Sequence, residues 1–166
     1  MDNTGEDQVW QPLDVPYYLN ATEPVYTGSV LTLGSGTTTV ILAGTRIVMG
    51  SESYIRVGDD AVLVLAGVPG NEVVFTGEEQ VAGAWPGILM AGGGLAADHA
   101  VIEYAGDTSV FFVDAPLTFD RANGPTHCSH LRNVTIRDSS TYAVHIEDNY
   151  SNFVFLGENM QYSNVM

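Results

Sequence analysis

Carboxylates are the most numerous charged groups in this sequence, and a glycoside hydrolase needs two of them as general acid and base. The one pair of adjacent aspartates falls in a Gly-Asp-Asp-Ala segment at 58–61, which is typical of a turn. A polysaccharide lyase would instead need carboxylates around a cation, beside a basic residue that accepts a proton. The chain could supply such a set from Asp114, Asp138, Asp148, Glu103 and Arg137. Solvated charges on an outer face explain these residues more simply, so we assign no catalytic residue.

A second group with metal-ligand chemistry is the segment His127-Cys128-Ser129-His130. A structural zinc site needs a fourth ligand at a defined spacing, and the remaining histidines fall in other segments. A lone cysteine near histidines also suits a nucleophile, but the spacing places no orienting Asn or Asp. We therefore predict a polar loop over 121–130, with no metal and no cofactor.

Aromatic and polar side chains on one outer face can bind a sugar or a neighbouring chain. Two aligned segments, 99–114 and 133–148, with the residues that follow them, predict such a strip. Its members are Phe111, Tyr142, His145, Glu147 and Tyr150. Single exposed aromatic residues are common on protein surfaces, so the strip is a candidate binding face and no more.

Composition excludes two classes of partner. The chain has 166 residues, enough for one domain, and carries 20 acidic residues against five arginines and no lysine. Its net charge of −15 argues against binding to nucleic acid or to anionic lipid. No apolar run reaches the ~18 residues needed to span a membrane, so we expect no membrane insertion.

The elements that must position these groups are short strands between turn residues. The clearest are 30–33, 54–57, 62–65, 73–76 and 142–146. No window carries a convincing helical stripe, and helix is expected at most as a short turn near 95–99. Residues 1–14 are typical of a polar lead-in or cap, and 15–166 of one domain.

Internal repetition favours one all-β fold over a sandwich or barrel. Residues 31–44 align with 55–67, offset by 24 residues at the start and 23 at the end. Residues 99–114 align with 133–148 at a constant offset of 34, which places Val110 beside Val144, Phe112 beside Ile146 and Asp114 beside Asp148. The same offset predicts a surface ion pair between Glu103 and Arg137. Matching apolar positions at every second residue are what stacked strands require. We predict a parallel β-helix, a solenoid of four to five coils with three short strands per coil.

Four coil-building motifs follow one another in the chain: Val40–Ile47, Val73–Thr76, Trp85–Ile88 and Ala100–Gly106. Together they resemble bacterial right-handed parallel β-helix repeat modules, pectate-lyase-like in shape, over about residues 25–157. In the Trp-Pro-Gly-Ile motif, we expect the ring over a coil and Gly87 in a close backbone approach beneath it. The resemblance implies a right-handed helix and an extracellular or cell-surface location. The Gly-His-Gly and Arg-x-Lys signatures of polygalacturonases are absent.

These patterns predict a non-catalytic structural or adhesive module of a secreted or cell-surface protein, presenting a binding or self-assembly face. The alternative is a carbohydrate-active enzyme, a polysaccharide lyase or glycoside hydrolase that uses outer-face carboxylates. Expected partners are a second copy or the flanking coils of a longer chain, and a polysaccharide.

Overall fold

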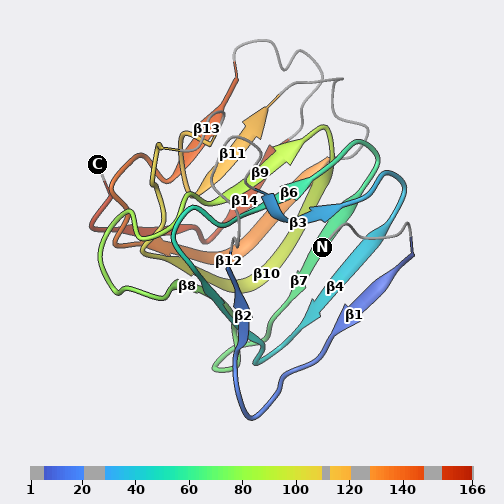
Figure 1. Ribbon diagram of the computed structural model, residues 1–166. Helices are drawn as coiled ribbons and strands as arrows, with labels where there is room; N and C mark the ends of the chain where they lie inside the picture. Colours follow the sequence, from blue (N-terminus) through green and yellow to red (C-terminus); the bar gives the residue numbers. More distant parts are fainter. Residues whose placement is uncertain (1–5, 21–28, 110–112, 121–127, 148–154, 166) are drawn as a thin grey trace.

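The computed structural model describes residues 6–20, 29–109, 113–120, 128–147 and 155–165. Within these ranges the protein is all-β, with no helix (Figure 1). The strands are β1 (Gln8–Trp10), β2 (Tyr17–Leu19), β3 (Ser29–Leu33), β4 (Thr38–Leu42), β5 (Arg46–Met49), β6 (Tyr54–Val57), β7 (Val62–Ala66), β8 (Val73–Gly77), β9 (Ile88–Ala91), β10 (Gly94–Glu103), β11 (Leu117–Asp120), β12 (Ser129–Arg137), β13 (Val144–Ile146), β14 (Phe155–Glu158) and β15 (Gln161–Ser163). The short helical turn expected near 95–99 is wrong, because these residues lie in β10.

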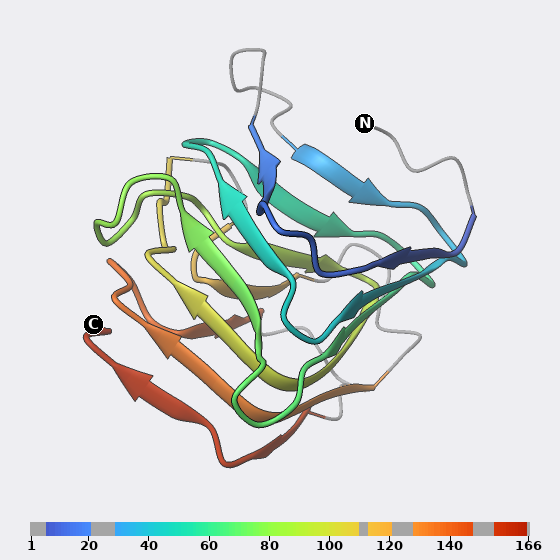
Figure 2. The same cartoon turned by 90° about the horizontal axis from the view of Figure 1, so that it is seen from below.

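All pairings between these strands are parallel, and they form three ladders. The first runs β1-β4-β7-β10-β12-β14, the second β2-β5-β8-β10-β12-β15, and the third β3-β6-β9-β11-β13. The first two ladders are joined into one ten-stranded sheet, and the third is a separate five-stranded sheet. The sheets curl around a common interior (Figure 2).

Strands β10 and β12 join the first two ladders because each is long enough to serve both. Residues 94–98 of β10 pair with β7, and residues 100–102 pair with β8. The residue between the two halves is His99, at φ 48°, and Asn133 takes the same place in β12 at φ 53°. A single left-handed residue turns a strand sharply, and Asn adopts this conformation more readily than most residues.

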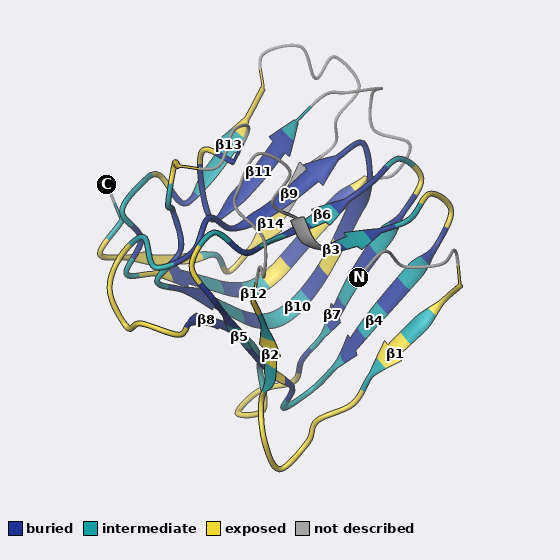
Figure 3. Cartoon of the chain, in the orientation of Figure 1, coloured by how far each residue is buried: buried dark blue, intermediate teal, exposed yellow. Residues whose placement is uncertain are grey.

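The core lies inside the curled sheets, as the alternation of buried and partly exposed positions along β4 and β7 shows (Figure 3). Because successive strand residues point to opposite faces, every second side chain enters the interior. The largest fully buried side chains include Trp85, Phe75 and Phe119. Trp85 stacks on Phe75 with ring centroids 6.4 Å apart, and its indole N–H donates to the Glu103 carbonyl at 2.9 Å. The ring thus lies in the core and not over a coil.

The expected close approach at Gly87 is confirmed, but against a different neighbour. Its φ is 144°, and a Cβ there would lie 2.6 Å from the Ala115 carbonyl oxygen and 2.8 Å from that of Pro116. Only glycine has the space and the backbone freedom for this crossing.

The predicted registers hold over most of their length. Leu31 pairs with Ile55 and Leu42 with Ala66, so the offset of 24 holds from Leu31 to the end of β3 and along β4; only Ser29, before a register shift, pairs at 25, with Tyr54. The expected drop to 23 is wrong. Instead, Arg46 pairs with Val74, an offset of 28, because the connection between β7 and β8 carries extra residues. The offset of 34 holds along the whole β10–β12 pairing.

In the third ladder the offset of 34 is wrong. Val144 pairs with Leu117, and Ile146 with Phe119, so the offset is 27. The predicted partners at 110 and 112 and Asp148 lie outside the described residues. The physical reason lies at Val113, which is fully buried against Leu89 and Ala91, outside the main core. Val113 therefore packs over β9 before the chain enters the ladder at β11.

Candidate functional site

Two open grooves lie side by side along the bend between the first and second ladders. The first, of about 510 Å³, has Val64, Ala66 and Ala96 among its lining residues and ends at Asp98 and Arg132. The second, of about 370 Å³, is lined mainly by polar side chains: Glu72, His99, Asn133, Thr135, Asn159 and Gln161. The connection between β7 and β8 contributes Val68 to the first groove and Pro69 and Gly70 to the second. The extra residues that change the register therefore also line both grooves.

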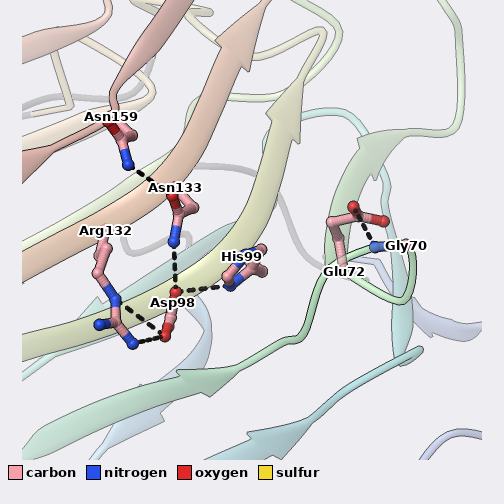
Figure 4. A network of polar contacts seen from close by, with 7 residues as sticks. All are labelled: Gly70, Glu72, Asp98, His99, Arg132, Asn133 and Asn159. Atoms are coloured by element: carbon pink, nitrogen blue, oxygen red, sulfur yellow. Dashed lines mark hydrogen bonds and ion pairs between the residues drawn. The ribbon is translucent and has the colours of Figure 1, made fainter.

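Asp98 is the centre of the polar network at this bend (Figure 4). Its Oδ2 accepts hydrogen bonds from Nε of Arg132, at 3.1 Å, and from Nη2 of the same side chain. Its Oδ1 lies 2.6 Å from Nδ1 of His99 and accepts from Nδ2 of Asn133 at 3.0 Å. Four contacts thus hold the carboxylate at the boundary between the grooves.

The charge of Asp98 is stabilised by these partners. The hydrogen bond from Arg132, with smaller contributions from Asn133 and His99, lowers the pKa of Asp98 from 3.8 to about 2. The same bond raises the pKa of the Arg132 guanidinium. Asp98 is therefore ionised throughout the physiological range and cannot act as a general acid there.

Left-handed residues continue the polar row along the bend. Asn159 has φ 50° and donates from Nδ2 to Oδ1 of Asn133 at 3.0 Å. A similar stack lies at a second bend, where Asn164 donates to Oδ1 of Asp138 at 2.7 Å. The Asn159–Asn133–Asp98 chain of hydrogen bonds fixes the side chains that border the grooves.

The predicted pair of Glu103 and Arg137 is confirmed, with one difference. Arg137 donates to Oε2 of Glu103 from Nε at 2.9 Å and from Nη2 at 2.6 Å. Nη2 of Arg46 lies 3.8 Å from the other oxygen, Oε1. Glu103 is only 5 % exposed, so this is a buried carboxylate under two arginines and not a surface ion pair.

The carboxylates that would supply a lyase site fall into separate groups. Oδ2 of Asp138 lies 4.0 Å from Nε of Arg137, the arginine that binds Glu103. Asp114 lies instead near His145. Asp148 is outside the described residues. No set that combines all these side chains is formed in the described part of the chain.

Of the predicted binding strip, Phe111 and Tyr150 lie outside the described residues. Tyr142 is strongly exposed just before β13. His145 and Glu147 lie together, joined by Asp114, with the ligand atoms of all three within 4.8 Å of one another. The strip itself stays a prediction.

The predicted loop over 121–130 ends earlier than expected. Residues 121–127 are outside the described ranges, Cys128 is exposed, and Ser129 and His130 already belong to β12. The buried Ser129 hydroxyl accepts from the Leu95 N–H at 3.1 Å, so this part of the segment supports the sheet.

The network at Asp98 was not predicted from the sequence, although Asp98 and Arg132 lie directly before the two aligned segments. The alignment at an offset of 34 residues begins at His99 and Asn133, which occupy the bend. One residue earlier, the same offset pairs Asp98 with Arg132. An opposite-charge pair directly before a left-handed residue could have located the bend.

Among the described residues, no helix is long and apolar enough to cross a membrane. No protein-family model, curated protein or solved structure matches the chain. The parallel all-β structure is compatible with the β-helix resemblance.

Proposed function

We propose that the chain is a right-handed parallel β-helix module of a secreted or cell-surface protein, without catalytic activity, that binds a neutral polysaccharide along the two grooves. The repeating order of the strands supports the solenoid. Strands β4, β5 and β6 pair with β1, β2 and β3 in that order, and β7, β8 and β9 then pair with β4, β5 and β6. This repetition is what stacked coils of three strands require.

The single observation that carries the binding role is that Asp98 is ionised and held in place by its neighbours. A carboxylate between two grooves, held by Arg132, His99 and Asn133, is a fixed hydrogen-bond acceptor for a hydroxyl group. Around it, the grooves offer amides, imidazoles and a guanidinium, the groups that recognise sugar hydroxyls. A net charge of −15 disfavours a polyanion such as a polyuronate, so a neutral polymer is the better fit.

The enzyme alternative requires a carboxylic acid with a raised pKa near the bound sugar. Of the two described groove carboxylates, Asp98 has a lowered pKa, and Glu72 accepts a hydrogen bond from the Gly70 N–H at 3.1 Å. The lowered pKa of Asp98 does not favour proton donation to a leaving group. The geometry therefore supports holding a glycan and not cutting it.

Affinity electrophoresis through gels containing neutral polysaccharides tests this function. Retardation by at least one polymer is expected, with Arg132→Ala and His99→Ala migrating as in a blank gel. Arg56→Ala, an arginine on β6 outside both grooves, is the matched control and should be retarded like the unmodified chain. Release of reducing ends or unsaturated products, lost in Asp98→Asn, would establish the enzyme instead.

We propose in addition that the module assembles with flanking coils or with a second copy, and the pairing of the outermost strands supports this. In the described chain β1 pairs only with β4, and β14 and β15 pair only with β12. The other edges of these strands carry backbone donors and acceptors that flanking coils or a second copy can pair. Light scattering over a dilution series should give an oligomer whose mass is independent of concentration; a monomer throughout would rule out self-association.

A further inference from the structure

The outer face of the third ladder carries a histidine between two carboxylates, away from the grooves. Nε2 of His145 lies 3.6 Å from Oε1 of Glu147 and 4.0 Å from Oδ2 of Asp114. These separations exceed hydrogen-bond length. One imidazole nitrogen and two carboxylate oxygens therefore face a common space.

Buried parts of β11 fix the backbone beneath this group. Thr118, 1 % exposed, pairs in register with His145. Its hydroxyl accepts from the Asp114 N–H at 3.0 Å and from the Ala115 N–H at 3.1 Å. The next residue, Phe119, accepts the Glu147 N–H at 3.1 Å through its carbonyl. All three outer side chains thus start from positions held by the core.

The ligand set selects the kind of cation. Imidazole suits zinc and other first-row transition metals, whereas Ca²⁺ and Mg²⁺ prefer sites made of oxygen alone. In a tetrahedral zinc site with bonds near 2.0–2.1 Å, neighbouring ligand atoms are about 3.3 Å apart. The exposed carboxylates of Asp114 and Glu147 reach that spacing by small rotations, and their two negative charges balance a divalent ion.

We propose that Asp114, His145 and Glu147 form a binding site for a divalent first-row transition metal, with Zn²⁺ as the ion that fits best. Three protein ligands leave a fourth position for water or for a ligand atom from another molecule. Such a site would give the module a metal-dependent contact at the third ladder. The two grooves are lined by strands of the first and second ladders, so this contact would be independent of glycan binding.

Zn²⁺ titration of the full chain, followed by calorimetry at pH 7.5, tests the proposal. One ion per chain is expected at this site, and His145→Ala or Glu147→Gln should weaken its binding by about tenfold or more. His130→Ala is the matched control, because His130 is an exposed histidine on β12 beside the free Cys128. Its affinity should equal that of the unmodified chain. Binding that survives His145→Ala and is lost in His130→Ala would overturn the proposal and assign the ion to the Cys128 segment.

Histidine side-chain NMR of the unmodified chain gives a test that needs no substitution. Zn²⁺ should shift the ring signals of His145 and leave those of His99 and His130 in place. A His145 ring that does not respond to Zn²⁺ contradicts the proposal. Tighter binding of Ca²⁺ than of Zn²⁺ to the same residues would contradict the assignment to a transition metal.

Discussion

Glu103 and Arg137, 34 residues apart in the chain, are direct partners across β10 and β12, and one oxygen of the buried carboxylate accepts both guanidinium hydrogen bonds. The hydrogen bond to Glu103 also raises the pKa of Arg137. A buried carboxylate is tolerated only while its charge is compensated. The pair is therefore a sensitive point for stability.

Arg137→Ala should lower the free energy of unfolding by about 2 kcal/mol, less than the ~3–5 kcal/mol for a fully buried pair. The loss is smaller because Arg46 remains 3.8 Å from Glu103 and Arg137 itself is half exposed. Urea unfolding measures the difference. The double variant Glu103→Gln/Arg137→Ala, which removes the buried charge, should recover part of the stability. Equal losses in both variants would show that the charge of Glu103 is not what Arg137 compensates.

Stability should also depend on pH through Asp98. Its pKa is about 2 in the folded protein against an ordinary value of 3.8, so the folded state binds fewer protons than the unfolded state between these values. The stabilisation is complete above about pH 4 and is lost as pH falls toward 2. Thermal unfolding of Asp98→Asn should show a deficit of roughly 1 kcal/mol at neutral pH, which disappears over that interval. Asp14→Asn, an exposed aspartate without an ion pair among the described residues, should follow the unmodified chain at every pH. A deficit for Asp98→Asn that persists at pH 2 would contradict the assignment.

Gly87 should be the least replaceable of the glycines with positive φ. Gly87→Ala places a methyl group 2.6 Å from the Ala115 carbonyl oxygen, in a backbone conformation that L-residues rarely adopt. We expect a loss of about 3 kcal/mol, from strain and overpacking together. Gly36→Ala is the control, because its φ is also positive but nothing lies within 4 Å, so the cost should be about 1 kcal/mol. Similar losses in urea unfolding would mean that the crossing at 115–116 relaxes freely.

The sequence predicts the parallel all-β structure because alternation and repeat offset are local properties of the chain. The offset of 34 located the partners of β12, and with them the pair of Glu103 and Arg137. It failed at β13 because Val113 packs outside β9, a tertiary contact that no periodicity reveals. The burial of Glu103 was missed for a similar reason, since an outward position in a strand does not show that Arg46, from another strand, reaches it. The grooves depend on the β7–β8 connection, which begins where the alignment of 31–44 with 55–67 ends, so its extra residues have no counterpart in that alignment.

Thr118 should couple the stability of β11 to the proposed metal site. Thr118→Val keeps the shape of the side chain but removes the acceptor for the N–H groups of Asp114 and Ala115, and the hydroxyl that donates to the Ala115 carbonyl at 3.2 Å. Leaving such groups without partners should cost about 1–3 kcal/mol. Because Asp114 then loses its fixed backbone position, Zn²⁺ affinity should fall as well, although no ligand is changed. Thr141→Val is the control, since that hydroxyl makes one long bond of 3.4 Å to the Tyr142 carbonyl, and it should change neither quantity by a comparable amount. A Thr118→Val chain that loses stability but keeps full Zn²⁺ affinity would show that the carboxylate of Asp114 finds the ion without help from the core.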